Sequence, residues 1–426
     1  MTELKRVLGL PMLTFYGVGM ILGAGIYTII GKAAGVAGTS VWISLIIAAI
    51  VATLAGLSYA ELAAMFPKVG GEYIYLRNAF PKMKWVANTS GLMMAFAGIT
   101  TASSVALAFS GYLQQFVSVS PFIIAFFLML FFTLIGILGI EESSWMNILF
   151  TSIETSGLII FIGLGVQMPE FTSALATTIT TSTFSASALI IFAYFGFENI
   201  VNFAEEAKNP EKTIPRAVLL SIAISIVLYV LVALSAMALL PIADLAASDA
   251  PLSDAVRTVS PKLAGVLGGI ALFATSNTVL ISLVTTSRIL LGMARDQSLP
   301  KAFTKISEKR KTPWFSAIIT FIACCALLPL GEVEVIASIS SFSTLIAFIA
   351  VHSALIVLRF TRPQLDRPFR IPFNIIKIPV FPVLGAIATF LLLFQFEREV
   401  YVVGGGFFLL LLVFQVLTSF VKSKLT

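Results

Sequence analysis

The sequence is poor in charge. Only 11% of its 426 residues are charged, whereas 58% are hydrophobic. A soluble domain cannot enclose so much apolar surface in one core, which excludes an ordinary soluble protein. The apolar runs have the length of membrane-spanning helices, about 20 residues, and lack the alternation of a membrane barrel. The sequence therefore predicts an all-α polytopic membrane protein.

Cysteine and histidine are nearly absent. Cys324 and Cys325 are adjacent in one apolar run, where neighbouring side chains diverge and cannot form a disulfide. The one histidine, His352, lies in another run; we interpret it as a hydrogen-bonded structural residue, with titration near neutral pH as the alternative. HExxH, GxSxG and P-loop patterns are missing. These absences argue against an intramembrane enzyme, and we expect no cofactor and no metal site.

Twelve apolar runs, separated by charged or Pro/Gly/Asn-rich breaks, predict twelve spans. They cover residues 11–34, 40–66, 86–116, 121–140, 144–167, 185–205, 215–240, 262–294, 314–330, 334–360, 377–396 and 400–421. With the N-terminus inside, most of the 27 Lys and Arg residues fall in inner segments, which places both termini in the cytoplasm of a cell-membrane protein. The net charge of +6 then has a topological cause and indicates no nucleic-acid partner.

Two predicted spans carry glycine where a helix needs support. The first contains Gly19, Gly23 and Gly25 in GMILGAGIYTII, and the sixth contains Gly196 in FAYFGFEN. Gly costs about 1 kcal/mol relative to Ala inside a helix, and a broken backbone in lipid must face a cavity. Close helix packing is the alternative, because Gly19 and Gly23 also form a GxxxG pair. Interruptions in these two positions are typical of inverted five-helix repeats with a substrate at the midplane.

Five groups of motifs follow one another along nearly the whole chain. They are GMILGAGIY, SYAELAAMFPKVGGEYIYLRNAF at 58–80, FAYFGFEN with AEEAKNPEKTIPRA at 204–217, SRILLGMARDQSLP at 287–300 with TPW at 312–314, and LRFTRPQLDRPFRIP at 358–372. In this order they resemble the amino acid-polyamine-organocation (APC) superfamily of transporters. The resemblance implies a leucine-transporter-like fold in one transporter domain, 1–426, with inverted repeats over 11–167 and 185–360 and two added helices over 377–421.

The resemblance also implies where an amino acid binds. Its carboxylate is expected at the amides of Ala24, Gly25 and Ile26, at the positive end of a half-helix, and its ammonium at carbonyls of both broken spans. Some members carry a serine where this chain has Ala24. The residues expected to bind the substrate come from the two broken spans and from two further spans. They are Ile21, Gly23, Ala24, Gly25, Ile26, Phe192, Phe195, Gly196, Ser104 and Ser282. The ammonium-binding carbonyls are those of Ile21, Phe192 and Phe195.

Glu154 departs from the pattern of the superfamily. Several proton-coupled members carry a lysine there, and a charged side chain in mid-span costs about 3 kcal/mol. Four interpretations remain open: the carboxyl takes and releases a proton, pairs with Arg288, holds a cation with Ser282 and Thr285, or is a hydrogen-bonded structural acid. The residues expected to couple or gate transport are Glu154, Glu198, Phe192 and Thr285; Phe192 matches an aromatic that closes over the substrate.

The predicted function is secondary active transport of amino acids by alternating access. Because the pocket shows no clear additional carboxylate, we expect neutral or broad-range amino acids, and exchange of cationic amino acids or polyamines is the alternative. We expect a proton as the coupling ion and the lipid bilayer as the environment of the protein. We infer no obligatory protein partner. A channel and a non-transporting receptor are the other possible classes, and the paired interruptions favour alternating access over a pore.

Overall fold

The computed structural model describes residues 3–114, 117–248, 250–330, 333–375, 378–395, 398–411 and 413. The α-helices are α1 Leu10–Ala37, α2 Val41–Met65, α3 Gly71–Ala79, α4 Lys84–Leu113, α5 Pro121–Leu138, α6 Ile140–Val166, α7 Glu170–Ser173, α8 Thr181–Ile190, α9 Pro210–Leu239, α10 Ile242–Ala247, α11 Pro251–Arg257, α12 Pro261–Arg295, α13 Trp314–Leu327, α14 Val333–Thr361, α15 Val380–Leu392 and α16 Arg398–Val400. Short 3₁₀ helices are η1 Gly38–Ser40, η2 Ile191–Tyr194, η3 Phe197–Phe203, η4 Lys301–Thr304, η5 Leu328–Leu330 and η6 Leu393–Gln395, and η7 Tyr401–Gly405 is a π-helix. Strands β1 Asn374–Ile375 and β2 Ile378–Pro379 pair antiparallel.

The chain is a helical, multi-pass membrane protein. Its described residues contain nine helices long and apolar enough to cross a membrane, and these match the first eight predicted spans and the tenth. The predicted ninth and eleventh spans correspond to shorter apolar helices, Trp314–Leu327 and Val380–Gln395. Of the twelfth, at 400–421, the structure describes residues 400–411 and 413, and the rest lies outside the described residues. The count of twelve spans therefore stays a prediction.

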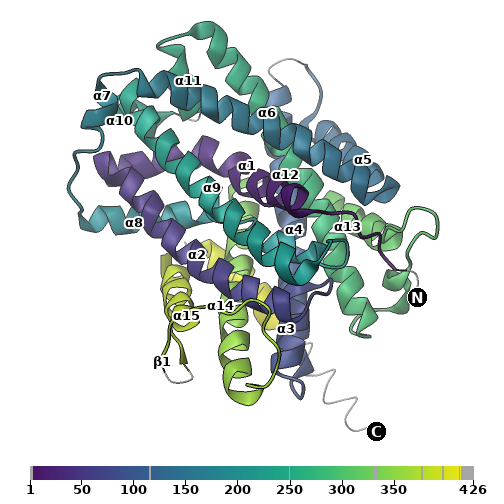
Figure 1. Ribbon diagram of the computed structural model, residues 1–426. Coiled ribbons are helices and arrows are strands. Elements are labelled where there is room, and N and C mark those ends of the chain that lie inside the picture. Colours follow the sequence, from purple (N-terminus) through teal and green to yellow (C-terminus); the bar gives the residue numbers. More distant parts are fainter. Residues whose placement is uncertain are drawn as a thin grey trace.

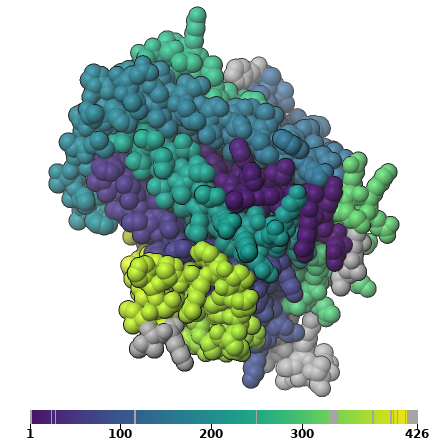
Figure 2. Space-filling model, viewed as in Figure 1, coloured from purple at the N-terminus to yellow at the C-terminus, as the bar shows by residue number. Residues whose placement is uncertain are grey.

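Helix α1 lies inside the bundle, where it contacts α6, α9 and α12. In Figure 1, α5 and α6 run along the upper part of the molecule and α14 and α15 lie at its lower end. The space-filling view shows the same division, with blue residues of α5 and α6 above and the yellow-green C-terminal helices below (Figure 2). Phe127 and Trp145, from α5 and α6, are 61% and 64% exposed, as expected of side chains that face lipid.

The described residues interrupt both spans in which the sequence places glycines. Gly23 has φ −11° and ψ −155°, which breaks α1 into two halves. The sixth span changes from α8 into η2, then opens at Phe195 and Gly196 before η3 begins. Gly196 has φ +135°, a conformation that side chains with a Cβ rarely adopt. Each interruption therefore lies at a glycine, which can adopt the backbone angles that the interruption requires.

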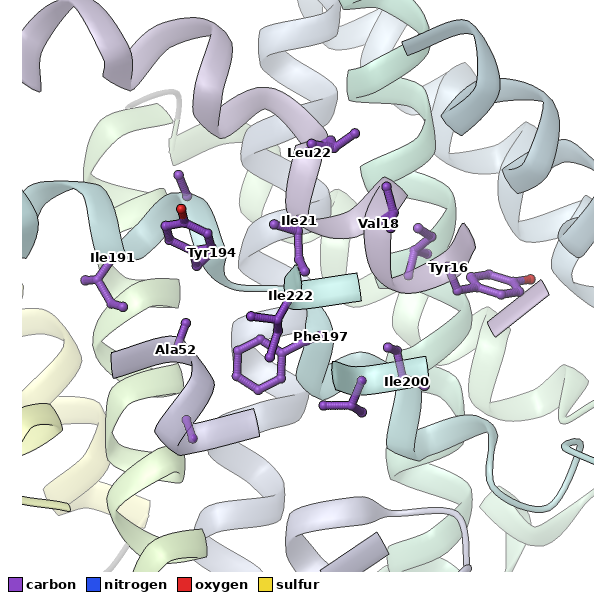
Figure 3. Packing of buried hydrophobic residues seen from close by; sticks show 14 of the residues in the cluster. Tyr16, Val18, Ile21, Leu22, Ala52, Ile191, Tyr194, Phe197, Ile200 and Ile222 are labelled. Carbon is purple, nitrogen blue, oxygen red and sulfur yellow. The ribbon is translucent and has the colours of Figure 1, made fainter. Parts of the chain in front are cut away.

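The two interruptions lie side by side. Figure 3 shows α1 turning away beyond Ile21 and Leu22, next to the segment that carries Tyr194 and Phe197. The apolar side chains of these segments pack into the main core, so they hold the non-helical turns between rigid helices. This packing positions the site described below.

Candidate functional site

A cavity of about 110 Å³ lies where the two interrupted spans meet. This volume can hold several water molecules or one small solute. The residues of the interrupted spans that line it are Met20, Ile21, Gly23, Gly25, Phe192, Ala193, Phe195, Gly196, Glu198 and Asn199. Helices α4, α12 and α14 complete the wall. The cavity thus has the location that the sequence predicts for a substrate site.

Glycines allow the backbones of the two interrupted spans to approach each other. A Cβ on Gly25 would lie 3.2 Å from the Ala193 Cα, and one on Gly196 would lie within 2.9 Å of three atoms of Met20. Gly23 faces α12 in the same way, because its Cβ would lie 2.5 Å from the Thr278 hydroxyl. Any larger side chain at these positions would push the walls of the cavity apart.

A tyrosine that sequence analysis missed joins both interruptions. The Tyr229 hydroxyl, from α9, donates to the carbonyl of Ile21 and lies 3.0 Å from the carbonyl of Ala193. The Ile21 carbonyl, predicted to receive a substrate ammonium, therefore already accepts a hydrogen bond. The available signal was a single tyrosine in an apolar span, because a buried tyrosine hydroxyl usually has a partner. Similarly, the Phe192 carbonyl accepts from the Phe195 amide at 3.2 Å.

The opposite wall combines hydroxyl groups with small and apolar side chains. The Ser340 hydroxyl of α14 lies 2.6 Å from that of Thr101 and donates to the Ala97 carbonyl at 3.0 Å, both on α4. The lining from these helices is Met94, Ala97, Gly98, Thr101, Val105, Thr278, Ser282, Thr286, Ile289, Ser340 and Thr344. The wall is therefore mostly neutral and suited to an apolar or weakly polar side chain.

The predicted site residues fall into two groups. Ile21, Gly23, Gly25, Phe192, Phe195, Gly196, Glu198 and Ser282 line the cavity. Ile26, Ser104, Thr285 and Glu154 are buried outside its lining, and Ala24 belongs to α1 with its side chain outside the described part of the structure. The Ser104 hydroxyl donates to the Thr101 carbonyl and that of Thr285 to the Ile281 carbonyl, each within its own helix.

Glu198 is the one charged side chain among the described residues that line the cavity. One of its carboxylate oxygens accepts a hydrogen bond from the Gly196 backbone amide at 2.8 Å, and the other accepts one from the Asn199 side-chain amide at 3.3 Å. The carboxylate thus satisfies a backbone donor that the interruption releases, as the lipid environment requires. It also places one negative charge at the cavity.

Glu154 is fully buried on α6, and neither of its carboxyl oxygens has a hydrogen-bond partner among the described residues. The interpretation in which Glu154 pairs with Arg288 is wrong. The Arg288 guanidinium instead binds Glu206 through two hydrogen bonds, of 2.6 and 2.7 Å, and both side chains are buried. The Glu154 carboxyl interacts electrostatically with the hydroxyls of Tyr27 and Tyr229, the second of which joins the interruptions.

Gly19 and His352 take packing positions away from the cavity. A Cβ on Gly19 would lie 2.1 Å from the Thr151 hydroxyl, so its function is close contact between α1 and α6. The His352 ring bonds the Ser58 hydroxyl through Nδ1 at 2.9 Å and packs on Gly385. Across the described residues, no group of three or more His, Cys, Asp or Glu side chains could hold a metal ion.

The family described as amino acid permease matches residues 8–420. The chain belongs to this family, within the APC superfamily. It is 30% identical over 408 residues to the branched-chain amino acid permease BcaP of Bacillus subtilis, covering 89% of this chain and 86% of that protein. It is 29% identical to the methylthioribose transporter of the same organism, covering 90% and 87%. The vacuolar cationic amino acid transporter 4 of Arabidopsis thaliana is 29% identical, covering 85% of this chain and 64% of that protein. The family and these relatives indicate a transporter of the amino acid permease type.

Proposed function

We propose that this permease is a secondary active transporter of neutral amino acids in the cell membrane, with both termini in the cytoplasm, and that it works by alternating access. The observation that carries the proposal is the cavity where the backbones of the two interrupted spans meet at Gly25 and Ala193. Such a site presents helix ends of both signs to a ligand that is itself a carboxylate and an ammonium. In this proposal the repeats over 11–167 and 185–360 move around the site.

The charges of the site suit an amino acid backbone. The second half of α1 begins after Gly23, and its positive end favours a carboxylate by about 0.3 to 2 kcal/mol. The Glu198 carboxylate, beside the second interruption, favours an ammonium group nearby. Phe192 lies in the lining with its ring 6.0 Å from that of Phe195, where it can close over a bound ligand.

The side-chain wall favours neutral amino acids. It combines Met20, Met94 and Ile289 with hydroxyl groups, and it adds no second carboxylate to the described lining. The relative named as a branched-chain amino acid permease agrees with this preference. Glu198 supports the alternative, transport of a cationic amino acid or polyamine, because among the described residues its second oxygen accepts a hydrogen bond only from the Asn199 side-chain amide, at 3.3 Å.

We propose a proton as the coupling ion and Glu154 as the residue that carries it. Glu154 is buried and lacks a hydrogen-bond partner among the described residues, which favours a neutral, protonated carboxyl in the resting bundle. Its electrostatic interaction with Tyr229 would let its charge act on the interruption in α1.

The test is uptake by the purified full chain in liposomes. Labelled leucine, alanine, arginine and putrescine are supplied with a pH gradient, a sodium gradient or neither. We expect saturable uptake of leucine or alanine, increased by an acidic exterior. Uptake of arginine or putrescine alone would favour the alternative substrate class, and uptake of none of the four would contradict the proposed function.

A further inference from the structure

A second group of buried polar side chains lies at the junction of α2, α3 and η3. Glu72, Tyr59, Tyr75 and Asn202 are all fully buried. Among the described residues, neither oxygen of Glu72, neither tyrosine hydroxyl and neither atom of the Asn202 amide has a hydrogen-bond partner. Buried polar groups without partners are rare and need a specific explanation.

Tyr59 connects this group to the cavity. Its ring lies 6.4 Å from that of Tyr75 and 5.8 Å from that of Phe197, the residue before Glu198. The Tyr59 hydroxyl interacts electrostatically with both the Glu72 and the Glu198 carboxyl. Asn202, on η3, is the fourth member of the group. Its Oδ1 lies 3.3 Å from the place where a Cβ on Gly71, the residue before Glu72, would be. Two buried carboxyls on different elements therefore share one neighbour.

Burial raises the pKa of Glu72 to about 7, and the Glu198 carboxylate acts in the same direction. The backbone amide of Glu72 itself, at the start of α3, and the nearby Tyr59 hydroxyl act against this increase. Two buried carboxyls that repel each other do not both ionise readily, so their protonation is linked. Near neutral pH Glu72 is therefore present in both its protonated and its ionised form.

The cations near α3 are engaged elsewhere. The arginines of α12, α14 and α3 each form an ion pair with another acid. These pairs are Arg288 with Glu206, Arg295 with Glu205, Arg359 with Glu61, and Arg77 with Asp296. Lys84, at the start of α4, is exposed, and His352 of α14 bonds Ser58. The titratable groups that face Glu72 are thus Tyr59, Tyr75 and Glu198.

We propose that Glu72 is a proton-binding residue whose charge is set jointly with that of Glu198, so that the proton on Glu72 controls amino acid binding in the cavity. With Glu72 neutral, Glu198 keeps its negative charge, caps the Gly196 amide and faces the substrate ammonium. When Glu72 loses its proton, the second negative charge disfavours the Glu198 carboxylate. The effect on substrate rests on the function proposed above, whereas the proton site itself does not.

The first test measures equilibrium binding of labelled leucine by the purified chain between about pH 5 and pH 9. We expect the wild-type affinity to be constant in acid and to fall by up to about tenfold per pH unit above pH 7. Glu72→Gln, which fixes the neutral form, should keep the acid-side affinity at every pH. Glu211→Gln, at an exposed position on α9, is the matched control and should titrate like wild type. A Glu72→Gln variant with the wild-type pH profile, or a wild type without pH dependence, would overturn the proposal.

The second test needs no substrate. A carboxyl whose folded pKa is raised stabilises the protein in acid, and this contribution is lost as pH rises through the folded value. We expect the apparent Tm of wild type to fall by a few degrees as pH rises from about 5 to about 8, and Glu72→Gln to lose this slope. Tyr59→Phe should keep the slope with its midpoint shifted. Parallel curves for wild type and Glu72→Gln would overturn the proton site even if the chain binds no amino acid.

Discussion

Tyr229→Phe tests whether one hydroxyl holds the two interruptions together. The substitution keeps the ring, which lies 5.1 Å from that of Tyr194, and removes only the donor to the Ile21 and Ala193 carbonyls. A net hydrogen bond contributes about 1 kcal/mol, and a buried carbonyl left without a partner costs about 1 to 3 kcal/mol. We expect a total loss of about 2 kcal/mol, which lowers the apparent Tm and weakens leucine binding about tenfold, because the cavity loses its fixed backbone.

The matched control is Tyr194→Phe. The Tyr194 hydroxyl is also buried, but it has no hydrogen-bond partner among the described residues, so its removal should be neutral or slightly stabilising. Both variants are purified in the same detergent and compared by thermal unfolding and by leucine binding. Equal behaviour of the two variants in both assays would refute the role assigned to Tyr229.

Three further substitutions test other parts of the structure. Glu206→Gln should lower the free energy of unfolding by about 3 kcal/mol, measured as apparent Tm against Glu211→Gln, because it leaves the Arg288 charge buried; equal Tm values would contradict this. Gly19→Val should destabilise by at least about 1 to 3 kcal/mol, since its Cβ would meet Thr151, and an unchanged Tm would argue against close packing there. Glu154→Gln should abolish uptake driven by a pH gradient while exchange continues, and unchanged driven uptake would remove the coupling role.

The broad architecture was accessible from the sequence. Runs of apolar residues set the positions of most spans, because a helix must cross a hydrocarbon layer of fixed thickness. The glycines at 23 and 196 indicated the interruptions, since few other residues permit them in a membrane. Both signals are local, so they could be found without a structure.

The side of each helix that faces the cavity was only partly accessible. On α12 the prediction named Ser282, which lines the cavity, but it missed Thr278 and Thr286, and on α4 it named Ser104, whereas Thr101 lines the cavity. Neighbouring helical positions differ by about 100° in direction, so an error of one residue moves a side chain off the wall. The partner of Arg288 was missed for a related reason: Glu206 lies 82 residues away in the sequence, and only the packed helices bring the two together.

The most direct test of the central claim is uptake of labelled leucine by purified wild type and Gly25→Val in liposomes. A Cβ at this position would lie 3.2 Å from the Ala193 backbone, so valine forces the two interrupted spans apart and distorts the cavity between them. We expect saturable uptake by wild type and loss of uptake in a Gly25→Val variant that still folds, shown by its unfolding transition. A folded Gly25→Val variant that takes up leucine at the wild-type rate would contradict the assignment of this cavity as the substrate site.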